Sequence, residues 1–244
     1  MKVDEKDIQE CIDFFKKYKF VDLSHRLEEH MPSYPAHSKY YHNLWESYWH
    51  GDVAVAYQIC MNEHSATHVD APAHFIREES SPAYKWMDAL AVDCLFGRCI
   101  MLNLQDMPPK TGVNADRVIA WEKEQDVRIK ENDIVLCNFG WYKRWKLRPE
   151  AEPFLSDWPG IGKNGAEYLA ERKIRAVGTD AIALDVYGDL SFPAHYVLLK
   201  EEILIMENLN NLDELPPVSY FMALPLNIKD GSGSPIRAVG LVPK

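Results

Sequence analysis

The sequence lacks three features that would each point to a common class of protein. No apolar run is long enough to cross a bilayer, and no glycine-rich phosphate loop of either common type is present. The opening segment, MKVDEKDIQECIDFFKKYKF, is charged and amphipathic, without the continuous apolar stretch of a signal peptide. We therefore expect neither a membrane anchor, nor an export signal, nor a nucleotide cofactor.

Cysteine is also scarce. The five cysteines are odd in number and lie mostly in apolar stretches, a distribution unlike that of a disulfide scaffold. Cys94 and Cys99 are close in sequence, but no second cysteine pair accompanies them, so a structural zinc knuckle is not expected. We predict reduced thiols and a cytoplasmic protein.

Basic residues are outnumbered. The 27 Lys and Arg residues face 37 Asp and Glu residues, which gives a formal net charge of −10. Such a chain repels phosphate backbones and anionic lipid surfaces, so neither nucleic acid nor a membrane is an expected partner. With 244 residues and 47% hydrophobic composition, it can bury a substantial core. We expect one globular domain over residues 1–244.

Hydrophobic patterning predicts an α/β fold. Asp4 to Lys17 has helical spacing, and Met31 to His50, rich in aromatic residues but without periodicity, is expected to be an ordered loop that covers a site. Apolar and alternating runs predict further strands and helices in turn. The strands are expected at Val53 to Met61, Arg98 to Leu104, Ile134 to Asn138, Ala176 to Thr179, Ile203 to Met206 and Tyr220 to Leu226, the helices at Ala115 to Glu124 and Asn164 to Arg172, and a turn-rich segment at Asp230 to Pro235.

One short segment gathers most of the chemistry. HSATHVDAPAHF, from His64 to Phe75, holds three of the nine histidines and an aspartate. Imidazole and carboxylate ligands without thiolate suit a divalent metal in a catalytic site, where a coordination position stays free for water. Independent, hydrogen-bonded histidines would not account for this density.

The spacing leaves two local geometries open. His64, His68, Asp70 and His74 share even parity, so an extended stretch presents them on one face. His68 and Asp70 would then lie roughly 6.6 Å apart along the strand, whereas a straight strand from His64 to His74 would span about 33 Å and must bend. Alternatively, His64 and His68 could meet on one helical turn that ends before Pro72. The zinc-peptidase motif is excluded, because Ser65 stands where it requires glutamate.

HSATHVDAPAHF resembles the signature of the kynurenine formamidase and cyclase superfamily. Further similar segments are VDLSHRLEEHMPSYP, DIVLCNFGW, GTDAIALD, HYVLLKEEILIMENLNNLDEL and DGSGSPIRAV. The resemblance implies a single domain with a mixed β-sheet core and flanking helices, of the swivelling β/β/α type. The family has glycine where this chain has Ala66, and alanine there would cost about 1 kcal/mol if φ were positive.

The resemblance also implies roles for seven residues. His64, His68 and Asp70 would hold one metal, while Asp70 and Glu207 would bridge to a second one completed by His195. His74 would be the catalytic acid and base, with a ligand or supporting role as its alternative, and Tyr34 would contact substrate. One or two ions per chain are implied, zinc by preference and manganese otherwise. Of the remaining five histidines (His25, His30, His37, His42 and His50), we expect one to approach the pocket.

The function implied is hydrolysis of an N-formyl, lactam or lactone bond in a small aromatic substrate by metal-activated water. Two alternatives remain open, a metal-dependent cyclase or dehydratase and a non-catalytic metal- or ligand-binding module. The resemblance further implies a homo-oligomer, either a dimer or a tetramer.

Overall fold

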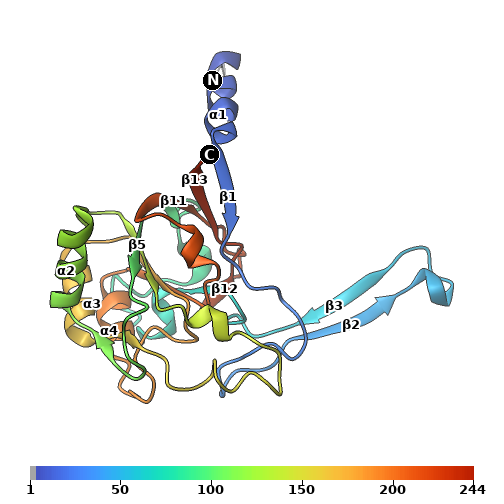
Figure 1. Cartoon of the computed structure of the whole chain (residues 1–244). Coiled ribbons are helices and arrows are strands. Elements are labelled where there is room, and N and C mark those ends of the chain that lie inside the picture. The colour runs from blue at the N-terminus through green and yellow to red at the C-terminus, as the bar shows by residue number, and fades with distance from the viewer. Residues whose placement is uncertain (1–3) are drawn as a thin grey trace.

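The fold is built around one large mixed sheet (Figure 1). The computed structural model describes residues 4–244, and within them nine strands follow the order β1-β13-β11-β5-β7-β9-β10-β4-β12. Two small sheets, β2-β3 and β6-β8, lie outside it. The strands are β1 (Tyr18–Asp22), β2 (Tyr41–Glu46), β3 (Ala56–Cys60), β4 (His68–Asp70), β5 (Phe96–Asn103), β6 (Gly112–Val113), β7 (Ile134–Asn138), β8 (Gly160–Ile161), β9 (Ala176–Thr179), β10 (Leu204–Glu207), β11 (Val218–Met222), β12 (Gly233–Pro235) and β13 (Val239–Pro243).

The centre of the sheet is parallel and its flanks are antiparallel. Strands β5, β7, β9 and β10 pair in parallel, whereas β11 and β4 join this block antiparallel. Both faces of the parallel strands β7, β9 and β10 are buried. On β7, Val135 and Cys137 enter one core cluster while Ile134 and Leu136 enter the other, as the two-residue period of a strand requires. The α/β architecture predicted from the sequence is confirmed.

Three helices, α2 (Ala115–Gln125), α3 (Lys163–Glu171) and α4 (Pro193–Lys200), cover one face of the sheet (Figure 1). α2 begins at Asn114, whose side chain accepts the Arg117 N–H, and α4 begins with a proline in its first turn. In contrast, α1 (Glu5–Lys16) buries none of its residues and stands away from the body beside β1 and β13. It matches the helix predicted over Asp4 to Lys17.

The segment from Met31 to His50 differs from the prediction. Its first part is irregular, but β2 forms within it and pairs with β3 to make a two-stranded arm that projects from the body (Figure 1). Every residue of β2 is exposed. Without a buried face the strand has no apolar alternation, so a periodicity argument predicts a loop there.

The strand and helix predictions elsewhere are mostly confirmed. β7 and β9 have the predicted bounds, and the ends of α2 and α3 lie within one residue of theirs. Two elements near the site were missed. α4 lies in a segment for which no helix was predicted, and the turn-rich segment contains β12, which is short and begins with glycine.

Two further observations bear on the sequence predictions. All five cysteines are free thiols, with Cys99 and Cys137 buried in the core. Among the helices of residues 4–244, none combines the length and the apolar character that crossing a membrane requires.

Candidate metal centre

His68 and Asp70 lie on β4, which is enclosed between β10 and β12. Glu207 of β10 pairs in register with His68, so the β4 pair and this carboxylate meet at one place. The extended geometry is therefore confirmed, and the helical turn through His64 and His68 is wrong.

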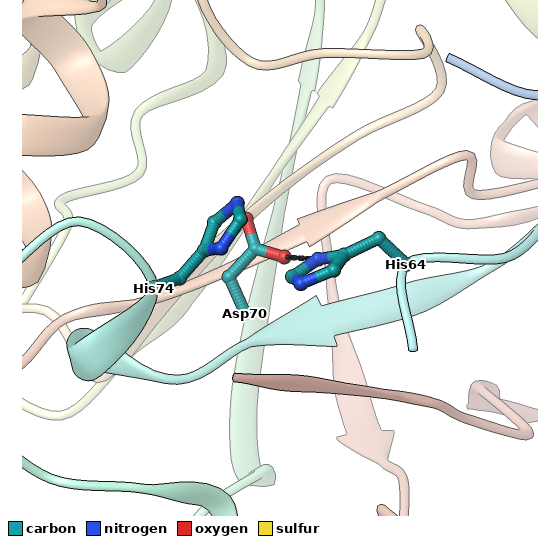
Figure 2. A group of neighbouring side chains, drawn as sticks. All are labelled: His64, Asp70 and His74. Carbon is teal, nitrogen blue, oxygen red and sulfur yellow. Dashed lines mark hydrogen bonds and ion pairs between the residues drawn. The ribbon is translucent and has the colours of Figure 1, made fainter. Parts of the chain in front are cut away.

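The chain bends on both sides of β4. Ala66 has a φ of 49°, and Pro72–His74 forms a single 3₁₀ turn. These bends bring His64 and His74 back onto Asp70: Nδ1 of His64 lies 2.6 Å from Oδ1 of Asp70, and the two imidazole rings stack with centroids 4.0 Å apart. Figure 2 shows His64 and His74 on either side of the Asp70 carboxylate. A straight strand could not have gathered these residues.

The left-handed backbone at Ala66 also orients His68. The Ala66 carbonyl accepts hydrogen bonds from Nδ1 of His68, at 2.7 Å, and from Nδ2 of Asn208, at 2.9 Å. Because the carbonyl can only accept, Nδ1 is the donor, and Nε2 of His68 is the nitrogen left to face the site. That nitrogen lies 3.5 Å from carboxylate oxygens of both Asp70 and Glu207.

His195 enters the site from α4. Its Nδ1 lies 2.5 Å from Oδ2 of Asp185, a carboxylate that also accepts the backbone N–H groups of Ala194 and His195. Its Nε2 is left to face Glu207 Oε1 at 3.3 Å and Asp70 Oδ2 at 3.5 Å. Sequence reasoning missed Asp185, although it ends the quoted segment GTDAIALD, because only the fold brings it beneath His195.

The site concentrates buried charge. Burial opposes ionisation, but the His64 imidazole and hydrogen bonds from His195 and His64 hold the pKa of Asp70 well below its usual range. Burial likewise opposes protonation of His195, yet its bonds to Asp185, Asp70 and Glu207 raise its pKa well above normal. Without a metal, protons on imidazole thus compensate the carboxylates, and a divalent cation would replace those protons.

The donor atoms fit a divalent metal. In two overlapping groups, His64 with Asp70 and His74, and His68 with Asp70 and Glu207, the ligand atoms lie within 4.8 Å of one another. Both groups combine imidazole nitrogen with carboxylate oxygen, and both use Asp70. His74 therefore lies close enough to be a ligand, so its assignment as acid and base stays a prediction.

These residues line a cavity of about 200 Å³. Tyr34 and His37 of the segment before the arm line it too, together with Phe75 and Phe192. His37 is the one N-terminal histidine among the cavity residues, and its buried Nδ1 has no partner within the described chain. Tyr34, His37 and Phe192 also line a second cavity of about 560 Å³, so the two cavities adjoin.

His74 differs in its protonation from His68 and His195, whose pKa values the neighbouring carboxylates raise. Burial lowers the pKa of His74 to about 4, so its imidazole is neutral near pH 7. A neutral imidazole beside the donor cluster can accept a proton.

His25 and Asp180 lie outside this site, and burial shifts the pKa of each of them. His25 stacks on Trp145 with ring centroids 3.9 Å apart, and burial lowers its pKa to about 3. Asp180 accepts the backbone N–H groups of Phe139, Trp141 and Tyr142, while burial raises its pKa to about 7. The position of His25 is explained by its packing on Trp145, and that of Asp180 by the hydrogen bonds that it accepts from backbone N–H groups of the turn after β7.

Comparison with known proteins gives one consistent result. The model of the family described as putative cyclase matches residues 21–186. The chain is 30% identical to the kynurenine formamidase of Geobacillus thermodenitrificans over 221 residues (90% of this chain, 95% of the relative) and 34% identical to the isatin hydrolase of Roseibium aggregatum over 198 residues (75% and 73%). A crystal structure of an isatin hydrolase bound to the product analogue thioisatinate has a TM-score of 0.86 at 27% identity and covers 100% of both chains. This chain belongs to the putative cyclase family.

Proposed function

We propose that this chain is a metal-dependent hydrolase that cleaves an N-formyl or lactam amide, or a lactone, of a small aromatic substrate. The observation that carries the proposal is the convergence of Asp70, Glu207 and three imidazoles on one cavity, next to the neutral His74. Relatives named as a formamidase and a hydrolase support the same class of reaction.

The proposed ligands are His64, His68, Asp70, His195 and Glu207. Zinc is the proposed ion, with manganese as the alternative, because imidazole and carboxylate donors suit both. A bound divalent metal would supply a more acidic water and an electrophile for the substrate carbonyl.

The residues of the chain would do the rest. A ring nitrogen of the neutral His74 would take a proton from the attacking water, and the imidazolium formed in this way would return it to the leaving nitrogen or oxygen. Asp185 would keep His195 in place by accepting hydrogen bonds from its Nδ1 and from its backbone N–H. Phe75 and Phe192 would exclude water around the reacting bond.

The two adjoining cavities could hold an aromatic substrate whose reacting ring lies in one cavity and whose substituent lies in the other. The inner cavity is smaller than typical ligand pockets of roughly 300–1,000 Å³, so we place the scissile bond and its ring there and the remainder in the adjoining cavity. Tyr34 lies at their junction, where it would contact the substrate ring. Lys39 and Arg148 line the outer cavity.

A substrate panel tests the proposal directly. Metal-loaded protein should hydrolyse at least one of N-formylkynurenine, isatin or an aromatic lactone, as followed by absorbance and product chromatography. Failure to turn over any of them at full metal loading would contradict the proposal and favour a binding module.

We expect about two metal ions per chain, because Glu207 offers a second carboxylate beside Asp70 and two anionic ligands offset two close cations. Elemental analysis of protein purified without chelator should approach two ions, and Glu207→Gln should lose about one. Glu201→Gln, on an exposed residue of the same segment, is the matched control. One ion in both the wild type and Glu207→Gln would rule out the bridging role.

We further propose a cytoplasmic homo-oligomer, with each chain acting as one domain. The free thiols support a reducing compartment, and the arm supports association: Trp45 is 73% and Trp49 is 69% exposed. Sedimentation at micromolar concentration should give at least a dimer rather than 28.1 kDa. Replacing both tryptophans with serine should shift it towards monomer, whereas Val92→Ser, at another exposed apolar residue, should not. An unchanged mass would exclude the arm as the interface.

A further inference from the structure

The second ring nitrogen of His64 has a defined partner on the side away from Asp70. Nε2 lies 3.0 Å from Oγ of Ser232, just before β12. Ser232 in turn contacts Glu63, the residue that precedes His64: its Oγ donates to Oε2 of Glu63 at 2.6 Å, and its backbone N–H donates to the same oxygen at 2.8 Å. An unbroken path of hydrogen bonds thus runs from Glu63 through Ser232 and His64 to Asp70.

Gly233 fixes the ring in this contact. A Cβ at Gly233 would lie 2.5 Å from Cε1 and 2.9 Å from Nδ1 of His64, closer than packed side chains permit. The imidazole therefore lies directly against the β12 backbone. It has little freedom to turn away from Ser232.

The donor and the acceptor of each hydrogen bond in this path follow from the number of protons that each group carries. A serine hydroxyl has one proton to donate, and a carboxylate only accepts. Since Ser232 gives its proton to Glu63, its oxygen must accept from His64, and Nε2 of His64 must carry a hydrogen. Nδ1 faces the Asp70 carboxylate, which also only accepts, so without an ion this nitrogen carries a hydrogen too. An ion on the Asp70 side would displace the hydrogen of Nδ1, whereas Nε2 keeps its own for Ser232.

We propose that Glu63 and Ser232 are positioning residues that set the tautomer of His64, so that this histidine binds metal through Nδ1. The inference rests on the proposed function, because it assigns the geometry of the same metal centre. His68 and His195 have the opposite arrangement: their Nδ1 atoms donate to Ala66 and Asp185, and their Nε2 atoms face the site. The centre would thus combine one Nδ1 ligand with two Nε2 ligands.

Zinc binding and nitrogen NMR together test the proposal. Apo-protein is refilled with zinc in competition with a chromophoric chelator, and long-range ¹H–¹⁵N spectra of the zinc-loaded, histidine-labelled protein report which His64 nitrogen is protonated. We expect a protonated Nε2 in the wild type, and a zinc affinity about 10- to 100-fold weaker in Ser232→Ala, the usual effect of removing a group that orients a ligand. Glu63→Gln should populate the other tautomer, because an amide can donate to Ser232 and release its hydroxyl towards His64.

Ser234→Ala is the matched control. Ser234 is a buried serine of β12, two residues after Ser232, but its hydroxyl contacts Leu226 and Pro235 and does not contact His64. Its zinc affinity should equal that of the wild type.

The outcomes separate this inference from the proposed function. A wild type that binds no zinc or manganese would overturn both. A wild type that binds zinc with Nδ1 of His64 protonated, or a folded Ser232→Ala with unchanged affinity, would overturn the tautomer assignment alone. If Ser232→Ala does not fold, the wild-type spectrum still decides.

Discussion

His68→Ala should lose metal and activity together. His68 lies on β4, between β10 and β12, with Nε2 facing both carboxylates, so its loss removes a donor and leaves His195 as the one imidazole that Asp70 and Glu207 still share. We expect metal content to fall by at least about one ion per chain and kcat/KM by at least about 10³-fold, since a catalytic metal contributes several kcal/mol. We expect zinc to raise the Tm of the wild type but not that of His68→Ala.

His50→Ala is the control for this experiment, because His50 is exposed on the arm and lies outside the cavity. Circular dichroism of both variants shows whether the fold is kept. A folded His68→Ala that keeps its full metal content would remove His68 from the ligand set. The loss of activity would then need another cause.

His74→Ala should separate the chemistry from the metal. If His74 moves protons, its loss should leave the metal bound and lower kcat by about 10²–10⁴, the usual contribution of a positioned acid or base. The measurement is kcat at saturating substrate on protein whose metal content has been determined. His42→Ala, on an exposed histidine of the arm, serves as the control.

The structure makes this second experiment decisive, because His74 lies close enough to His64 and Asp70 to bind the same ion. Metal loss as severe as that of His68→Ala would make His74 a ligand and leave the proposed mechanism without its base. Retention of both metal and wild-type kcat would make His74 structural.

The sequence predicts the central elements well and the peripheral ones poorly, for a physical reason. β7 and β9 are buried on both faces, so they appear as short continuous apolar runs whose ends are also their boundaries. The arm strand β2 has no buried face, and nothing in its pattern distinguishes it from an aromatic loop. β12 is specified by its pairing with β4, which no local pattern can show.

The residues of the candidate site likewise fall into those that a local pattern predicts and those that only the fold brings together. The even spacing of His68 and Asp70 is a local property of a strand, and it correctly placed both residues on one face. The bend at Ala66 depends on a left-handed residue that is not glycine, which a sequence pattern does not reveal. Asp185, Ser232 and His37 meet the site only through tertiary contacts, so no local sequence pattern identifies them.

The position of β4 in the sheet has a consequence for how the chain acquires its structure. Both neighbours of β4 come late in the sequence, β10 at Leu204–Glu207 and β12 at Gly233–Pro235. During synthesis the ribosome releases His64 to His74 long before either neighbour exists, and this strand waits with both edges unpaired. Such non-local pairing is slow, because the intervening loop must close before any contact forms. The nascent chain therefore depends on the completion of its last segments to enclose this strand, and truncated chains would leave both of its edges open to aggregation.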